Sequence, residues 1–332
     1  MKLLVRAPMR EEDLAALSTL FDEIVFDPWN TTGRRWYEDE LLAELLRQQP
    51  DALITELDEV QEKVLAGYGR LQWVGDCRAT PENIDVAACS RYGVPLLCTP
   101  GRNAQAVAEM WLALVIGAMR NISPAIRWMK DGGWVKGTTP YHLWMGNELM
   151  YKRVAFVGMG AVPQHIARLL RPFECDITYF DPFVEQTDFP SVKRESIESL
   201  FEDADIISLH LPLNEQTRGM ITETMLSHIA PHALFVNTAR AGVVDCDALY
   251  RLLKEKTIRG AVIDVFENEP PEASDRRFFE LENCLVTPHI CGSTYEIADH
   301  QSRILTDRIL RFARGERGRA VVYNAKGLEE RA

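Results

Sequence analysis

The chain has 332 residues, of which 46% are hydrophobic, enough for two packed domains of ordinary size. Its 49 acidic side chains outnumber 37 basic ones, and the net charge of −12 disfavours binding to nucleic acid and to anionic lipid. The longest uncharged apolar stretch, residues 110–119, is about half as long as a membrane-spanning helix, and the N-terminal residues lack a signal-peptide core. Seven cysteines without C-x-x-C spacing favour reduced thiols, so we predict a cytoplasmic protein without a metal site.

Residues 1–104 alternate short apolar segments with amphipathic ones. The apolar segments predict strands over residues 3–7, 23–27, 51–55, 71–75 and 94–98. The amphipathic segments predict helices over residues 12–21, 38–47, 59–66 and 84–91. Because alternating strands and helices are typical of a parallel sheet with helices on both faces, we expect the chain to begin with one α/β domain.

A long apolar segment over residues 106–130 follows and predicts a helix that Pro124 kinks or breaks. After a loop over residues 131–146, a second alternation begins. Its strands are predicted over residues 153–158, 176–181, 206–211, 233–238, 260–265 and 284–287. Besides a helix directly after the first of these strands, helices are predicted over residues 197–204, 214–228 and 245–255. Six strands are the number expected of a dinucleotide-binding sheet.

The last predicted helix covers residues 294–314 and is expected to pack on the first domain. The predicted domains are therefore residues 1–104, completed by residues 299–332, and residues 105–298 between them. Both are expected to be doubly wound α/β domains built on parallel sheets.

A glycine-rich loop links the first strand of the second domain to its helix, where residues 154–164 read VAFVGMGAVPQ. Gly158 permits the tight turn, and Gly160 lets the backbone approach a pyrophosphate, which the N–H groups of Ala161 and Val162 can meet. Pro163 stands where the G-x-G-x-x-G pattern has its third glycine. Because proline is tolerated in the first turn of a helix, we expect the loop to keep its shape.

Asp181 closes the next predicted strand, about 20 residues after Gly160. A carboxylate there accepts hydrogen bonds from the ribose hydroxyls and repels a 2′-phosphate, which favours NAD over NADP. Two glycines in a strand-to-helix turn are by themselves ordinary turn chemistry. The strand, the helix and the acid together favour a cofactor site.

Three later strands each end in a polar cluster, within residues 237–242, 264–270 and 287–294. In a parallel sheet these ends share one crevice. An arginine can hold a carboxylate with two hydrogen bonds, and a histidine paired with a carboxylate keeps its proton to higher pH. Taken singly, each residue could be an ordinary loop or surface residue. Together, the clusters offer an arginine, an acid and a histidine, the set that suits reduction of a 2-keto acid.

Taken in order along nearly the whole chain, these stretches resemble the D-isomer-specific 2-hydroxyacid dehydrogenase family, close to its D-3-phosphoglycerate dehydrogenase and glyoxylate/hydroxypyruvate reductase members. Besides the glycine loop and the three clusters, the resemblance rests on residues 83–85 (NID), 99–103 (TPGRN), 106–109 (AVAE) and 210–212 (HLP), with Thr217. It implies a flavodoxin-like substrate domain, a Rossmann NAD-binding domain, and hydride transfer between C4 of the nicotinamide and C2 of the substrate.

The resemblance also implies roles for individual residues. Arg240 would bind the substrate carboxylate and keto oxygen, His289 would donate or accept the proton, and Glu269 would orient His289. The substrate-binding loop would comprise Arg78, Ala79 and Thr80. The implied cofactor-binding residues are Gly158, Gly160, Ala161, Val162, Asp181, His210, Pro212, Thr217, Thr238, Ala239, Asp264 and Gly292. For His210, an ordinary strand-end histidine is an equal alternative.

Arg78 and Arg102 add positive charge near the substrate loop, which leads to the hypothesis of a substrate with an anionic tail, such as 3-phosphoglycerate. The family's dimers form through the coenzyme domain, and residues 134–144, rich in aromatic side chains, suggest a contact arm. The expected partners are a small 2-hydroxy or 2-keto acid and a second copy of the chain, without nucleic acid or membrane.

Two other functions are compatible with the same motifs. Phosphite dehydrogenases resemble this family, and so do formate dehydrogenases, but the latter pair a glutamine with the histidine, so Glu269 disfavours formate. NAD-sensing corepressors of the C-terminal-binding-protein type keep the fold and the arginine, glutamate and histidine without needing turnover. Reduction of a 2-keto acid would separate the predicted enzyme from both.

Overall fold

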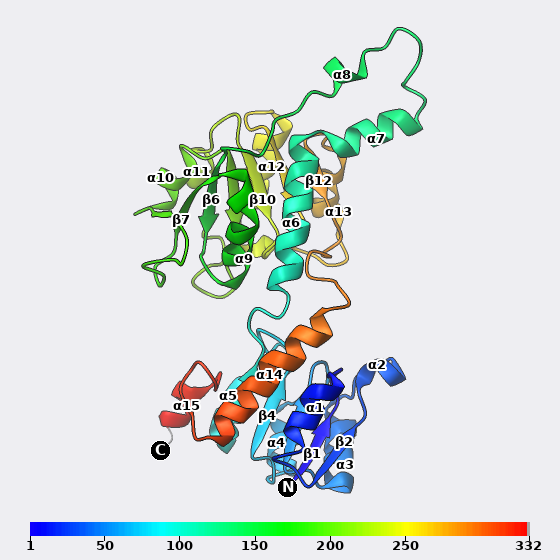
Figure 1. The fold of residues 1–332 in the computed structure, drawn as a ribbon, viewed down its shortest axis with the longest axis vertical. Coiled ribbons are helices and arrows are strands. Elements are labelled where there is room, and N and C mark those ends of the chain that lie inside the picture. The colour runs from blue at the N-terminus through cyan, green and yellow to red at the C-terminus, as the bar shows by residue number, and fades with distance from the viewer. Residues whose placement is uncertain (331–332) are drawn as a thin grey trace. The chain divides into compact units, whose positions relative to one another are not determined.

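A computed structural model describes residues 1–330 and divides the chain into two compact units (Figure 1). Unit 1 comprises Met1–Arg102 and the chain from Thr294 onward, and unit 2 comprises Asn103–Ser293. The C-terminal segment predicted for the first domain ends at residue 332, so its residues 331 and 332 lie outside the described residues.

Unit 1 is built on a five-stranded parallel sheet with the strand order β2-β1-β3-β4-β5. Its strands are β1 (Lys2–Val5), β2 (Glu23–Phe26), β3 (Ala52–Thr55), β4 (Trp73–Asp76) and β5 (Leu96–Cys98). The central strands read as nearly continuous apolar runs because helices cover both of their faces. This order is that of a flavodoxin-like sheet, as predicted.

The helices of unit 1 come from both ends of the chain. They are α1 (Glu11–Leu17), α2 (Trp29–Thr32), α3 (Glu38–Gln48), α4 (Glu62–Gly67), α5 (Val86–Tyr92), α14 (Ile297–Ala313) and α15 (Ala325–Glu329). Helix α14 buries Leu305 and Ile309 in one core with Leu3 of β1. A Cβ on Gly75 in β4 would lie 3.1 Å from Leu305, so this glycine lets α14 approach the sheet closely.

Unit 2 is built on a seven-stranded parallel sheet with the order β12-β11-β10-β9-β6-β7-β8. Its strands are β6 (Arg153–Val157), β7 (Asp176–Phe180), β8 (Val192–Lys193), β9 (Ile206–Leu209), β10 (Leu234–Asn237), β11 (Gly260–Ile263) and β12 (Cys284–Val286). The order reverses between β6 and β9, which is the switch point of a Rossmann fold. The predicted fold class is confirmed, with the short strand β8 added at one edge.

The helices of unit 2 cover both faces of its sheet. They are α6 (Ala104–Met119), α7 (Ile122–Lys130), α8 (Pro140–Leu143), α9 (Ala161–Leu170), α10 (Ile197–Phe201), α11 (Glu223–Leu226), α12 (Cys246–Lys254) and α13 (Ala273–Arg276). Helices α6 and α9 lie side by side in Figure 1 and share a core that includes Trp111, Phe156 and Ile166. Helices α10 to α12 form a second core with the other face of the sheet.

Two helix predictions were wrong in detail. The helix over residues 106–130 breaks at Asn121, which adopts a left-handed φ of 54°, whereas Pro124 is accommodated in the first turn of α7. Only Glu223–Leu226 is helical in the segment predicted as a helix over residues 214–228. There, Asn214 and Thr217 bond their side chains to nearby backbone groups and form a turn instead.

Within residues 1–330, no single helix is both long and apolar enough to cross a membrane. Helices α6 and α7 reach that length and composition only as a pair, with a bend of 64° between them.

Candidate active site

The glycine loop joins β6 to α9 in unit 2. Gly158 has a left-handed φ of 91°, and a Cβ there would lie 2.6 Å from the carbonyl oxygen of His210, so only glycine fits. By contrast, a Cβ on Gly160 would meet no heavy atom within 4 Å. The space in front of Gly160 is therefore open, as close approach of a phosphate requires.

Helix α9 begins at Ala161, so the N–H groups of Ala161 and Val162 have no acceptor within the helix. Pro163 is buried at the third helical position, where a missing N–H removes no intrahelical bond. The helix then continues to Leu170 and buries Ile166. The prediction that the loop tolerates Pro163 is consistent with this continuous helix.

Asp181 follows β7 and binds the glycine loop directly. Its Oδ2 accepts a hydrogen bond from the backbone N–H of Met159 at 2.8 Å. Its Oδ1 accepts from the N–H groups of Phe183 at 2.7 Å and Val184 at 3.1 Å. The carboxylate thus stabilises both the loop and the turn after β7, in addition to any contact with a ribose.

His210, Pro212 and Thr217 lie in the segment after β9. The His210 N–H donates to Val157 at 2.8 Å and so continues the pairing of β9 with β6. Burial lowers the pKa of His210 to about 3, so its imidazole is neutral near pH 7. Thr217 donates its hydroxyl to the Pro212 carbonyl at 2.5 Å, which closes the turn between them.

Thr238, Ala239 and Arg240 form a turn after β10 that the buried side chain of Asn237 shapes. Asn237 accepts from the N–H of Ala239 and donates to the carbonyl of Arg240, both at 3.0 Å. The Thr238 hydroxyl is buried and has no hydrogen-bond partner among the described residues. The Arg240 guanidinium is exposed, donates to the Ala239 carbonyl at 2.8 Å, and forms no ion pair within residues 1–330.

His289 and Glu269 form the hydrogen-bonded pair that the family resemblance implied. The Nδ1 atom of His289 lies 2.7 Å from Oε2 and 2.9 Å from Oε1 of Glu269. Glu269 engages Nδ1, whereas the Nε2 atom forms no hydrogen bond among the described residues. The His289 side chain is 44% exposed, and its backbone adopts a left-handed φ of 54°.

Asp264 fixes the loop that carries His289. Its buried carboxylate accepts from the hydroxyl of Thr287 at 2.6 Å and from the N–H groups of Ile290 at 3.0 Å and Cys291 at 2.9 Å. The loop is thereby bound to the end of β11 on both sides of the histidine. At its far end, a Cβ on Gly292 would lie 2.8 Å from the side chain of Asn103.

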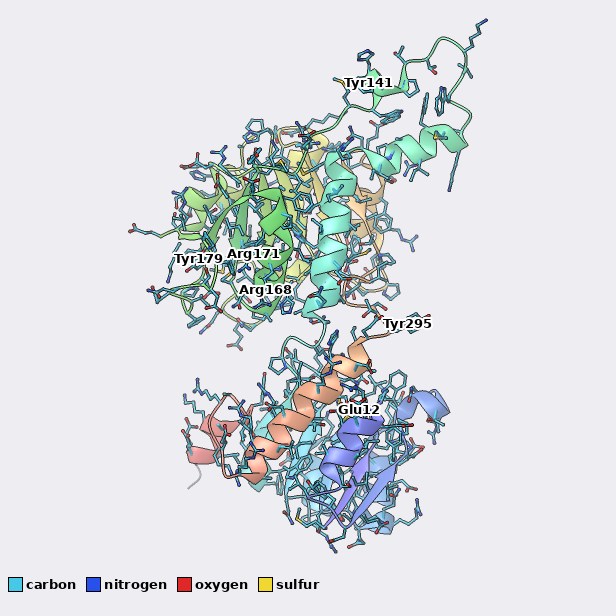
Figure 2. All side chains as sticks on the ribbon, in the orientation of Figure 1. Glu12, Tyr141, Arg168, Arg171, Tyr179 and Tyr295 are labelled. Carbon is cyan, nitrogen blue, oxygen red and sulfur yellow. The ribbon has the colours of Figure 1, made fainter. Side chains whose placement is uncertain are left out.

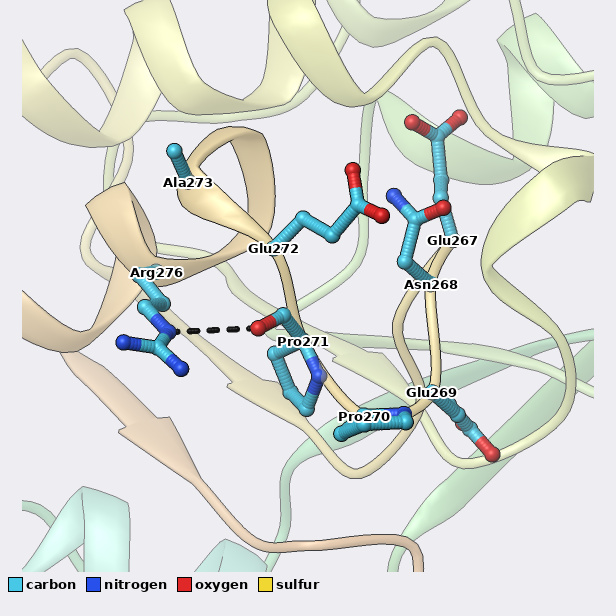
Figure 3. A pocket seen from close by; sticks show the side chains of 8 residues that line it. All are labelled: Glu267, Asn268, Glu269, Pro270, Pro271, Glu272, Ala273 and Arg276. Atoms are coloured by element: carbon cyan, nitrogen blue, oxygen red, sulfur yellow. Dashed lines mark hydrogen bonds between the residues drawn. The ribbon is translucent and has the colours of Figure 1, made fainter.

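Glu269 lies in the loop between β11 and α13, which lines an open hollow (Figure 3). The buried Asp275 accepts from the N–H groups of Glu267 at 3.1 Å and Glu272 at 3.2 Å, and from the Asn268 side chain at 3.1 Å. These bonds hold the loop on both sides of Glu269. In Figure 3 the Glu269 side chain points away from the other two glutamates.

The predicted substrate loop lies after β4 in unit 1. Ala79 and Thr80 are exposed, and Arg78 pairs with Glu82 at 3.2 Å. Arg102 is less available than the sequence suggested, because it forms an ion pair with Glu56 at 2.6 Å and also bonds Gln301.

Several residues near these segments escaped the sequence analysis. Asn237 and Asp275 shape the loops of Arg240 and Glu269, and both are polar residues that the structure buries. Trp111 and Ser208 form hydrogen bonds that lead to His210. Of these four residues, only Asn237 ends its strand, and a polar residue at a strand end is the one sequence signal that could have identified it. Within residues 1–330, no cluster of three or more His, Cys, Asp and Glu side chains could hold a metal ion.

Comparisons with known proteins agree with this geometry. Residues 112–291 match the family model described as D-isomer specific 2-hydroxyacid dehydrogenase, NAD binding domain. A protein of Bacillus subtilis (strain 168) named as the 2-hydroxyacid dehydrogenase YoaD is 43% identical over 99% of this chain and 96% of its own. A glyoxylate reductase of Thermococcus litoralis is 32% identical over 81% of this chain and 82% of its own.

A solved structure shows the same fold. A protein from Pyrococcus horikoshii OT3 superposes with a TM-score of 0.75 and 26% identity, over 99% of this chain and 97% of the other. The family match spans most of unit 2 and indicates a nicotinamide dinucleotide cofactor for this unit. The chain belongs to the D-isomer specific 2-hydroxyacid dehydrogenase family.

Proposed function

We propose that the protein transfers a hydride between NAD(H) and C2 of a small D-2-hydroxy acid or 2-keto acid. The observation that carries this proposal is the 2.7 Å pair of His289 and Glu269, in the unit that also holds the glycine loop and Arg240, which has no ion-pair partner among the described residues. The indicated substrates agree with the name of the glyoxylate reductase to which the chain is similar.

Each of the three residues has a distinct task in reduction. Arg240 binds the substrate carboxylate and polarises the keto oxygen. As the hydride reaches C2, the carbonyl π bond breaks and the oxygen takes a proton from Nε2 of His289. Glu269 accepts the hydrogen bond from Nδ1, orients the ring and balances its positive charge. The nicotinamide, when bound, supplies or accepts the hydride at C4.

The residues of unit 2 fit such a cofactor on two observations. The space at Gly160 is open to a pyrophosphate, and the buried Thr238 hydroxyl lacks a partner among the described residues. We propose that the glycine loop holds the pyrophosphate with Ala161 and Val162, and that residues from the ends of the later strands complete the site. These residues are His210, Pro212, Thr217, Thr238, Ala239, Asp264 and Gly292.

We propose NAD rather than NADP as the cofactor. The Asp181 carboxylate, which follows β7, would accept hydrogen bonds from the adenosine ribose and would repel a 2′-phosphate. The basic residues on the neighbouring strand are already paired, since Lys193 binds Glu185 at 2.7 Å and Arg194 lies 3.7 Å from Asp203.

We propose residues 1–104 and 299–332 as the substrate-binding domain and residues 105–298 as the NAD-binding domain. In the substrate loop, the N–H groups near Ala79 and Thr80 would bind the carboxylate. Arg78 would receive an anionic tail, such as the phosphate of 3-phosphoglycerate. Its only ion-pair partner among the described residues is Glu82, a surface contact that costs little to exchange.

The test is loss of NADH absorbance with glyoxylate, hydroxypyruvate, pyruvate, oxaloacetate and 3-phosphohydroxypyruvate, and gain of NADH from NAD and phosphite. We expect turnover of at least one keto acid, abolished by His289→Ala and retained in His228→Ala, whose exposed ring contacts Glu202. Turnover that survives His289→Ala would overturn the assigned acid. NADH binding without turnover would indicate a cofactor-sensing protein, and phosphite oxidation would indicate a phosphite dehydrogenase.

We also propose that the protein is a cytoplasmic homodimer. Its seven cysteines are all free, which suits a reducing compartment. Unit 2 carries an arm, defined here as residues 122–146, that includes α7 and α8 and extends beyond the sheet (Figure 1). The arm exposes large apolar side chains, among them Trp134 at 63% and Tyr141 at 81%. Figure 2 labels Tyr141 on this arm. A second copy of the chain would cover them.

A further inference from the structure

A hydrogen-bonded chain of three side chains links α6 to the end of β9 in unit 2. The indole Nε1 of Trp111 donates to Oγ of Ser208 at 2.8 Å. The same Oγ lies 2.9 Å from Nε2 of His210. Trp111 and Ser208 are fully buried, and neither takes part in the reaction proposed above.

One arrangement of donors and acceptors satisfies both the Trp111 indole N–H and the Ser208 hydroxyl. An indole N–H can only donate, so Ser208 must accept from Trp111. The hydroxyl hydrogen of Ser208 then needs an acceptor, and Nε2 of His210 is the acceptor at hand. If Nε2 carried a proton instead, it would compete with Trp111 as a donor and leave the buried hydroxyl hydrogen without a described acceptor.

The surroundings of His210 keep its ring neutral. The Phe156 ring packs against it with 5.5 Å between the centroids, and burial lowers the pKa to about 3. A neutral imidazole carries one proton, and with Nε2 acting as an acceptor that proton lies on Nδ1.

The Nδ1 atom of His210 forms no hydrogen bond within the described residues, and the ring packs on Phe156 of β6, the strand that leads into the glycine loop. The His210 backbone carbonyl is the group that forbids a side chain at Gly158, so the residue that carries the donor lies next to the turn that would hold a pyrophosphate. We infer that Trp111 and Ser208 are positioning residues that fix His210 in the Nδ1-protonated form, so that it donates a hydrogen bond to an oxygen of the bound dinucleotide. This inference rests on the proposed cofactor site.

The first test determines which ring nitrogen of His210 carries the proton in the absence of cofactor. Long-range ¹H–¹⁵N spectra distinguish protonated from unprotonated ring nitrogens, and the His210 signals are identified by their loss in His210→Asn. We expect Nδ1 protonated and Nε2 unprotonated near pH 7 in the wild type, and a mixture of both forms in Ser208→Ala. A proton on Nε2 in the wild type would overturn the inference.

The second test is NADH affinity by calorimetry. Ser208→Ala and Trp111→Phe are expected to raise the Kd about fivefold to tenfold, because the donor is no longer fixed. Ser208→Thr, which keeps the hydroxyl, is expected to restore most of the affinity. Ser227→Ala is the matched control, since the Ser227 hydroxyl donates to the Thr224 carbonyl of α11 and has no contact with His210 among the described residues.

The outcomes separate this inference from the proposed function. Wild-type protein that binds no NADH would contradict the proposed cofactor site and the inference with it. Tight wild-type binding that changes by less than twofold in both folded variants would contradict the inference alone. Circular dichroism establishes that each variant is folded, and Trp111→Phe provides the answer if Ser208→Ala does not fold.

Discussion

Glu269 lies beside His289 because polar residues at the ends of neighbouring parallel strands gather at one edge of the sheet. That rule predicted a shared crevice for the polar clusters, and the family resemblance implied the pairing of Glu269 with His289. The rule does not say how each side chain is held. The bonds from Asp264 to Thr287, Ile290 and Cys291 depend on the shape of an irregular loop, and no periodic pattern in the sequence encodes that shape.

The charge of Glu269 has a testable effect at the residue scale. In Glu269→Gln the oxygen can still accept from Nδ1 of His289, but no charge remains to balance the imidazolium. We expect kcat/KM for keto-acid reduction to fall about a hundredfold, within the range of general acid catalysis. Glu267→Gln, in the same loop, is the control in steady-state kinetics, and equal activities for the two variants would refute the role of the Glu269 charge.

Asp76 offers a test of stability in unit 1. Both of its carboxylate oxygens are buried at the end of β4 without a hydrogen-bond donor among the described residues. Desolvation raises its pKa well above the ordinary value, although Arg78 and Arg102 oppose the shift and Glu56 adds to it. The protonated Asp76 carboxyl therefore adds its full contribution to the free energy of unfolding at a pH below the ordinary pKa of an aspartate. This contribution is lost as the pH rises through the raised pKa and the buried carboxyl ionises.

We expect Asp76→Asn to raise the free energy of unfolding at pH 7 by about 1 to 3 kcal/mol, because the buried ionisable group is gone. The advantage should shrink as the pH falls toward 4. Thermal melts at several pH values measure it, with Asp39→Asn as a control at an exposed ion pair with Lys63. A lower melting temperature of Asp76→Asn at pH 7 would show that the carboxylate stabilises the fold.

At the scale of elements, apolar segments predicted every strand of both sheets except β8. This strand has only two residues and pairs only with β7, so it carries no apolar signature of its own. The helix predicted over residues 214–228 was wrong because Asn214 and Thr217 offer the backbone local hydrogen bonds that compete with a helix. Short elements such as α13 have too few residues for a periodic pattern, and α13 begins at a local capping box between Glu272 and Asp275.

The loop from Glu267 to Glu272 precedes α13, and its conformation depends on hydrogen bonds to Asp275. Asp275→Ala removes the acceptor that binds the loop on both sides of Glu269. We expect kcat to fall about tenfold or more, because a small displacement of an acid–base pair is costly, while the Kd for NADH stays unchanged. Asp247→Ala, at a surface ion pair with Arg277, serves as the control.

Steady-state kinetics measures the effect of Asp275→Ala and Asp247→Ala on kcat, and calorimetry measures their effect on the Kd for NADH. Together they separate an effect on the position of the loop from an effect on cofactor binding. A parallel loss of kcat and of NADH affinity in Asp275→Ala would indicate a general structural defect. Unchanged kcat would contradict the role of Asp275 in positioning Glu269.

At the scale of the whole molecule, the order of motifs along the chain predicted two α/β units, and the structure has two compact units. Part of this prediction came from family resemblance, which supplied the flavodoxin-like and Rossmann folds. The break between α6 and α7 could not be located in advance, because the left-handed conformation of Asn121 leaves no strong sequence signal.

The arm of unit 2 leads to a prediction about assembly. Its base is held by the rings of Trp128 and Trp144, 5.9 Å apart, and by a 2.9 Å bond from Asn121 to the Met145 carbonyl. Light scattering should give twice the mass of one chain. Trp134→Ser combined with Tyr141→Ser should shift the equilibrium toward the monomer. Tyr295→Ser changes an exposed tyrosine outside unit 2 and should leave this equilibrium unchanged (Figure 2). A monomeric wild type would refute the proposed dimer.

The central claim is hydride transfer from C4 of the nicotinamide to C2 of a keto acid. The most direct measurement of this claim follows deuterium from NADH labelled at C4 into the product. The fastest keto acid other than glyoxylate, whose product has no D or L form, is reduced with each C4 epimer of the labelled cofactor, and the product is analysed by mass spectrometry and for its configuration at C2. We predict a D-hydroxy acid with one deuterium at C2 from one of the two epimers, and no product with His289→Ala. An unlabelled product from both epimers, or the L configuration, would contradict the account.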